Sequence, residues 1–121
     1  MEAGLGTLEG FVVESNAGKG LSVEILNPGT KLVVRTLRSF YKITVLDGSR
    51  HLVRAEGGIF PEATTVRLSG ATFGGSAVKL GWIVVGLRVE FGLGLRHIKS
   101  SSVLSIALER PTFEEAYQQA A

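Results

Sequence analysis

The chain of 121 residues contains no cysteine and only two histidines. It therefore forms no disulfide. This absence fits a reducing cytoplasm and is equally common in plain secreted domains; we predict a cytoplasmic location. A transition-metal site would need both His51 and His97 together with carboxylates, yet each histidine stands alone in the sequence. We expect no metal ion and no other cofactor.

Long hydrophobic runs are also missing. The longest strongly apolar stretch, residues 80–87, lies between Lys79 and Arg88 and is far shorter than the roughly 20 residues that a membrane helix needs. Near the N-terminus, Glu2 stands where a signal peptide would carry a basic residue, and no apolar run follows. We expect a chain that neither spans a membrane nor is exported by that route.

The sequence contains no complete catalytic motif. The run Ser100-Ser101-Ser102 lies outside any Gly-x-Ser-x-Gly pattern. Gly18-Lys19 lacks the earlier glycine and the following Ser or Thr of a phosphate-binding P-loop. We therefore predict a protein that is not an enzyme, and we assign no catalytic residue.

Alternating apolar and polar residues, β-branched side chains and glycine breaks recur along residues 79–109. This pattern is typical of successive antiparallel strands. We predict an all-β fold, either a small antiparallel barrel or a two-sheet sandwich of seven or eight short strands. The predicted strands cover residues 10–14, 21–26, 31–36, 40–46, 50–56, 64–69, 80–91 and 103–109. Alternation places Leu32 and Val34 on one face of residues 31–36, and Tyr41, Ile43 and Val45 on the apolar face of residues 40–46.

The length predicts one domain over residues 1–121, with residues 10–110 as its β body. Residues 1–9 are rich in glycine and are expected to fray. Residues 112–121 are predicted to form a short C-terminal helix, because Thr112 and Glu115 match a capping box and Phe113 and Tyr117 share one face.

Turn residues predict the register of two hairpins. Asp47-Gly48 indicates a hairpin, and a three-residue loop through Ser49 pairs Ile43 with Val53, both apolar. That register places Lys42 opposite Arg54 on the outer face, which is unfavourable unless an anion or an acidic partner lies between them. A second three-residue loop, residues 92–94, is predicted to pair Glu90 with Arg96 and Val89 with His97. Residues 27–30, Asn-Pro-Gly-Thr, predict a type II turn.

The β body is basic. Residues 31–110 carry twelve Lys and Arg against five Asp and Glu, net +7, whereas both ends of the chain are acidic. A basic body attracts anions, and basic residues beside exposed aromatic rings are typical of single-stranded nucleic-acid binding. The candidate patch for an anion or nucleic acid consists of Arg35, Arg38, Phe40, Lys42, Arg50 and Arg54.

Residues 50–54, Arg-His-Leu-Val-Arg, contain one short motif of a known family. They resemble the Arg-x-x-x-Arg that opens the cyclic-dinucleotide site of the PilZ domain, itself a small β-barrel. The resemblance implies a cyclic-dinucleotide ligand. The family also has an Asp-x-Ser-x-x-Gly pattern, and residues 68–74 lack its acidic residue and its spacing.

The chain has a hydrophobic surplus, with 45% hydrophobic residues and a mean hydropathy of +0.27. A valine-rich core is one explanation, and a buried subunit interface is the other. On the predicted strand 80–91, Trp82 and Val84 lie on the face opposite Ile83 and Val85. Our leading hypothesis is a non-catalytic module that forms a homo-oligomer through Trp82 and Val84. Anion or nucleic-acid binding is the first alternative, and a barrel that holds a small apolar ligand is the second.

Overall fold

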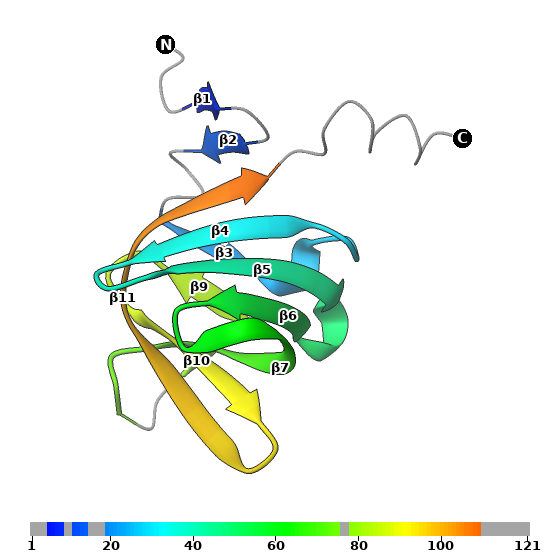
Figure 1. The fold of residues 1–121 in the computed structure, drawn as a ribbon, viewed down its shortest axis with the longest axis vertical. Coiled ribbons are helices and arrows are strands. Elements are labelled where there is room, and N and C mark those ends of the chain that lie inside the picture. The colour runs from blue at the N-terminus through cyan, green and yellow to red at the C-terminus, as the bar shows by residue number, and fades with distance from the viewer. Residues whose placement is uncertain (1–4, 9–10, 15–18, 76–77, 110–121) are drawn as a thin grey trace.

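The computed structural model describes residues 5–8, 11–14, 19–75 and 78–109, and Figure 1 shows strands joined by turns and two short 3-10 helices. These residues contain no α-helix, and the predicted helix over residues 112–121 lies outside them. The elements in chain order are β1 (Leu5–Leu8), β2 (Phe11–Glu14), β3 (Gly20–Ser22), η1 (Val23–Ile25), β4 (Lys31–Thr36), β5 (Phe40–Asp47), η2 (Gly48–Arg50), β6 (Leu52–Gly57), β7 (Phe60–Thr72), β8 (Lys79–Leu80), β9 (Trp82–Val84), β10 (Arg88–Leu93) and β11 (Arg96–Glu109).

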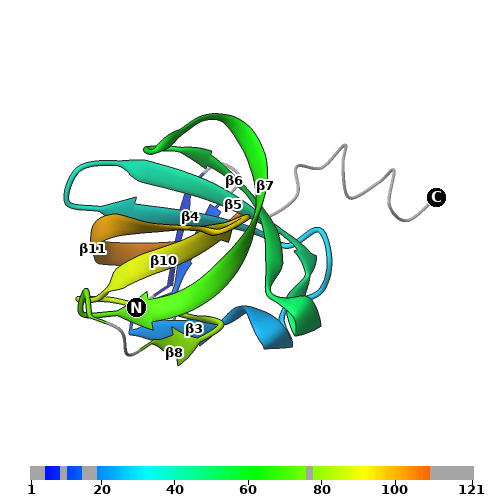
Figure 2. The same ribbon diagram turned by 90° about the horizontal axis from the view of Figure 1, so that it is seen from below.

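Six of these strands pair in a near-closed ring. Their order is β11-β10-β7-β6-β5-β4, and β4 pairs again with β11, every pairing being antiparallel. The two longest strands, β7 and β11, bend around the ring, so that each pairs with one neighbour in its first half and with another in its second half (Figure 2). The predicted all-β, antiparallel fold is confirmed.

A second, two-stranded sheet of β3 and β9 packs against the ring. The Val23 N–H donates to the Gly81 carbonyl over 2.9 Å, and the side chains of Val23 and Ile83 are fully buried with the barrel core. At the other edge, β2 pairs with β11 and β1 pairs with β2. β1 lies within residues 1–9, where the sequence predicted no strand.

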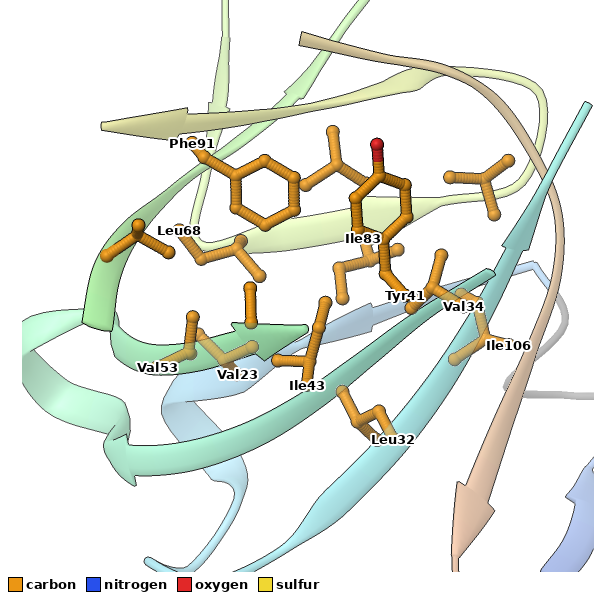
Figure 3. Packing of buried hydrophobic residues seen from close by; sticks show 14 of the residues in the cluster. Val23, Leu32, Val34, Tyr41, Ile43, Val53, Leu68, Ile83, Phe91 and Ile106 are labelled. Atoms are coloured by element: carbon orange, nitrogen blue, oxygen red, sulfur yellow. The ribbon is translucent and has the colours of Figure 1, made fainter. Parts of the chain in front are cut away.

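Hydrophobic side chains from the ring and the second sheet form one core, as Figure 3 shows. Three aromatic rings lie in contact there: the Phe91 centroid is 5.1 Å from that of Phe60 and 5.6 Å from that of Tyr41. The inward faces predicted for residues 31–36 and 40–46 are confirmed, because alternation of period two places every second side chain on the same face. Leu32, Val34, Tyr41, Ile43 and Val45 are all buried.

The prediction of a single strand over residues 80–91 was wrong. Gly81 and Gly86 adopt positive φ angles of 74° and 94°, which divide the segment into β8, β9 and the start of β10. β9 then pairs with β3 in the second sheet, whereas β10 joins the ring. Trp82 and Val84 therefore lie on a three-residue strand outside the ring.

The strand predicted over residues 21–26 ends early, at Ser22. The Ser22 hydroxyl accepts from the Glu24 N–H at 3.2 Å and caps η1, and this turns Ile25 out to solvent. The turn that follows was predicted correctly. Gly29 has a φ of 91°, and the Thr30 N–H donates to the Asn27 carbonyl over 3.1 Å.

The register predicted for the β5–β6 hairpin was wrong by two residues. The chain forms η2 and then His51 in the left-handed conformation, with a φ of 58°, so the connection is longer than three residues. Ile43 pairs with Ala55, and Lys42 lies opposite Glu56 rather than Arg54. A shift of two residues keeps every side chain on its predicted face but changes its partner, and the expected clash of like charges disappears.

The second hairpin was also assigned a loop that was too long. Leu93 pairs with Arg96, which places Glu90 opposite Lys99 and His97 opposite Gly92. The predicted pairs of Glu90 with Arg96 and of Val89 with His97 are therefore wrong. Leu93 is still part of the strand because the turn needs only Gly94, with a φ of 61°, and Leu95.

Candidate functional site

A pocket of about 350 Å³ lies between the β4–β5 turn, the β6–β7 turn and the β10–β11 hairpin. It adjoins the part of β11 that precedes Val103, the residue at which the pairing of β11 with β4 begins. Three of its ten lining residues are basic, five carry a hydroxyl group, two are apolar and none is acidic. They are Leu37, Arg38, Ser39, Tyr41, Ile59, Arg88, Lys99, Ser100, Ser101 and Ser102.

Hydrogen bonds hold the β4–β5 turn against β11. The Leu37 N–H donates to the Ser102 carbonyl over 3.0 Å, and the Arg38 N–H donates to the Ser101 hydroxyl over 3.1 Å. The turn itself is closed by Thr36, whose N–H donates to the Ser39 carbonyl over 2.8 Å. The backbone at Leu37 and Arg38 is thus positioned by two hydrogen bonds to the serine run, which keeps the Arg38 side chain beside the pocket.

The three serines of β11 have different surroundings. Ser100 is buried; its hydroxyl accepts from the Val89 N–H at 3.0 Å and donates to the Ser101 carbonyl at 2.6 Å, so it holds the irregular pairing of β10 and β11. The Ser101 hydroxyl accepts from the Arg38 N–H and retains its own proton for donation. Ser102 lies directly opposite Arg88 on β10.

Tyr41 forms part of the pocket wall and belongs to the aromatic core (Figure 3). Its hydroxyl accepts from the Ile59 N–H at 3.3 Å. Burial raises the pKa of Tyr41, and the hydrogen bond from Ile59 lowers it by less, so the hydroxyl stays protonated at neutral pH. Because its oxygen already accepts one bond, its proton is the part that is available to a ligand.

The charged groups give the pocket a positive character. Arg38 and Arg88 are exposed, and among the described residues neither lies within 4 Å of a carboxylate. Lys99 is shared, since its Nζ is 3.8 Å from Glu90 Oε1. Glu90 is buried and its other oxygen is 3.1 Å from His97 Nδ1. Two guanidinium groups therefore remain without a carboxylate partner in the part of the chain described.

Four residues of the basic patch predicted from the sequence, Arg35, Phe40, Lys42 and Arg54, lie on the outer face of the neighbouring strands β4, β5 and β6. Of the six residues of the patch, Arg38 alone lines the pocket. Arg35 lies over the exposed ring of Phe40, with Cζ 5.5 Å from the ring centroid. Lys42 lies opposite Glu56 and 3.8 Å from Glu109. Lys42 thus has acidic neighbours, and Arg35 and Phe40 contact each other.

Arg50 and Arg54, which carry the resemblance to the PilZ motif, lie on different elements. Arg50 belongs to η2 and its Nε is 3.7 Å from Asp47 Oδ2, whereas Arg54 is on β6, opposite Thr44 and Thr65. Neither residue lines the pocket.

Sequence reasoning missed Arg88, Lys99 and Tyr41 as pocket residues. Arg88 and Lys99 were part of the basic body, but they are separated by ten residues of a hairpin and lie far in sequence from Arg38. Tyr41 was assigned to the apolar face, which is correct for its buried ring. That assignment did not predict that Tyr41 also lines the pocket. The one sequence signal was the serine run of residues 100–102, whose hydroxyl groups can donate hydrogen bonds to a ligand without acting as nucleophiles.

Trp82 and Val84, the candidate oligomer interface, are each half-buried on β9. The Lys79 ammonium lies 3.8 Å from the Trp82 ring centroid, and the ring packs beside Gly20 of β3. The chain itself thus covers part of the tryptophan. Nearby on β8, Leu80 is exposed, and Phe73, which follows β7, is 88% exposed.

Each histidine pairs with one carboxylate. His51 Nε2 lies 2.6 Å from Glu24 Oε2, and this pair connects η1 to the start of β6. The second pair, His97 with Glu90, is far from it in sequence. Within the described residues, no group of three or more His, Asp or Glu side chains is arranged to hold a metal ion. No helix in this part of the chain is both long and apolar enough to cross a membrane.

Comparison of the chain with protein-family models, with curated proteins and with solved structures gives no match.

Proposed function

We propose that the pocket binds a small oxyanion of the phosphate class and that the protein is a binding module without catalytic activity. The observation that carries this proposal is the composition of the lining, in which Arg38, Arg88 and Lys99 meet five hydroxyl groups and no carboxylate. Arginine presents several N–H donors in one plane, which suits the oxygens of a phosphate, and hydroxyl groups add neutral donors.

Two further observations support a small anion over a nucleic-acid strand. A strand needs a continuous basic groove with stacking rings, but Lys42 and Arg50 each lie beside a carboxylate, and the exposed ring of Phe40 already contacts Arg35. The pocket, by contrast, gathers its cations within one small volume. Its Tyr41 and Ser101 hydroxyl protons can be donated without breaking the hydrogen bonds that position those side chains.

Titration with inorganic phosphate in a phosphate-free, low-salt buffer, followed by ¹H–¹⁵N NMR, tests the proposal. We expect the largest shift changes at the amides of Arg38 and residues 99–102. Arg88→Gln should weaken binding by about 10- to 100-fold, because hydrogen bonds to charged groups contribute about 1.5–3 kcal/mol. Added NaCl should weaken it further, since the guanidinium groups are exposed.

Arg54→Gln is the matched control, because it removes an exposed arginine of the predicted patch that lies outside the pocket. Its phosphate affinity should equal that of the unaltered protein. The proposal is wrong if phosphate causes no localised shift changes, or if Arg54→Gln weakens binding as much as Arg88→Gln.

A second candidate function is self-association through the surface of β9. Exposed apolar side chains at Phe73 and Leu80 lie close in sequence to half-buried Trp82 and Val84, and such patches are typical of protein interfaces. We propose that the protein forms a homo-oligomer through this surface.

Light scattering coupled to size exclusion tests this association. We expect a mass above that of one chain at high micromolar concentration, and Trp82→Asp and Leu80→Asp should each reduce it to one chain while keeping the circular dichroism of the fold. Leu95→Asp, at the exposed tip of the β10–β11 hairpin, should have no effect. A single-chain mass for the unaltered protein at that concentration would rule the interface out.

A further inference from the structure

The pocket has an apolar side as well as a basic side. Leu37 comes from the β4–β5 turn and Ile59 from the β6–β7 turn, and both line the pocket. Leu37 is 67% exposed and Ile59 is 44% exposed, so neither side chain is buried in the core. The two are therefore not needed to fill the barrel, and their apolar surface is available at the pocket.

The volume also exceeds what a bare inorganic ion requires. About 350 Å³ falls within the range of roughly 300–1,000 Å³ that is typical of sites for small organic ligands. Such sites combine apolar walls with a few placed polar groups. Here the polar groups belong to β10 and β11 and to Arg38, Ser39 and Tyr41, while Leu37 and Ile59 supply apolar contact from two turns.

We infer that the ligand is an organic phosphate monoester with a compact apolar or aromatic group. Its phosphate would contact the arginines and the hydroxyl protons, and its organic group would lie against Leu37 and Ile59. This inference rests on the proposed anion-binding function and adds to it the chemical class of the ligand.

The polar donors are arranged for one end of such a ligand. Tyr41 Oη accepts from the Ile59 N–H, and Ser101 Oγ accepts from the Arg38 N–H, so both hydroxyl groups are oriented by the same two turns that carry the apolar side chains. The backbone donors at Ile59 and Arg38 are therefore already used within the fold. A ligand whose phosphate meets these hydroxyl protons therefore lies close to the turns that carry Leu37 and Ile59.

The test compares the dissociation constants of phenyl phosphate and inorganic phosphate by the same NMR titration. We expect phenyl phosphate to bind about tenfold more tightly, the ratio that corresponds to about 1.4 kcal/mol of apolar contact. The double variant Leu37→Ser with Ile59→Ser should reduce this ratio to near one. Both positions are exposed, and the Ile59 N–H that donates to Tyr41 remains, so we expect the variant to fold; its circular dichroism and melting temperature check this.

Leu95→Ser is the matched control, since Leu95 is 98% exposed at a hairpin tip outside the pocket, and it should keep the tenfold ratio. Equal binding of phenyl phosphate and inorganic phosphate would overturn the inference and leave the anion-binding proposal intact. Binding of neither ligand would overturn both. A ratio that survives the double variant would place the organic group elsewhere and overturn the inference.

Discussion

Replacement of Phe91 by alanine is expected to lower the free energy of unfolding by about 3–5 kcal/mol. Phe91 is fully buried and lies in ring contact with both Tyr41 and Phe60. Truncation removes the transfer free energy of the ring and leaves a cavity beside Tyr41 of β5 and Phe60 of β7, two strands fixed in the ring of six, so collapse around it is limited. Urea denaturation followed by fluorescence or circular dichroism measures the change.

Leu95→Ala is the control for Phe91→Ala, because the Leu95 side chain is 98% exposed at a hairpin tip; its effect should stay within about 0.5 kcal/mol. A domain of this size is typically stable by only about 5–15 kcal/mol, so Phe91→Ala could be partly unfolded in water. Phe91→Leu, which leaves a smaller cavity, then provides a measurable intermediate. A loss below about 1 kcal/mol for Phe91→Ala would contradict the packing described for the core.

Gly70→Ala is expected to destabilise the protein by about 2–5 kcal/mol, the sum of backbone strain and overpacking. Gly70 has a φ of 149° and lies at the bulge where β7 changes register against β10. A Cβ atom there would collide with the backbone carbonyl of Lys79 on β8. Because the obstacle is backbone rather than a flexible side chain, β8 would have to separate from β7. Thermal and urea unfolding measure the loss.

Gly74→Ala separates the two causes. Gly74 also has a positive φ, 119°, but an added Cβ would meet no atom within 4 Å among the described residues. This variant should lose only the strain contribution, about 1 kcal/mol. If Gly70→Ala and Gly74→Ala lose equal amounts, the close approach of β8 to β7 does not contribute and the expected collision is not real.

Local pattern predicted the fold class and the faces of several strands. Leu32 and Val34 are buried as expected, and so are Tyr41, Ile43 and Val45, because alternation of period two is a local property that any half-buried strand must satisfy. The turn at Pro28-Gly29 was predicted from another local property, because a type II turn needs the positive φ that glycine supplies.

Registers and breaks were predicted less well. Period two distinguishes the faces of a strand but not a shift of two residues, so Ile43 was expected opposite Val53 and instead lies opposite Ala55. Glycine is compatible with a strand and with a turn. For that reason the alternation through residues 80–91 concealed the turns at Gly81 and Gly86. Charge along the sequence also does not show which acidic residues lie across the sheet from Lys42.

The sequence by itself determined the all-β class, the inward and outward faces of the central strands and an excess of positive charge in the body of the chain. The tertiary structure decided which of those charges meet. Arg38 reaches the pocket because its N–H is bonded to Ser101, 63 residues later, and Arg88 because β10 pairs with β11 there. The contact of Arg38 depends on ring closure between β4 and β11, a long-range pairing that no local propensity encodes.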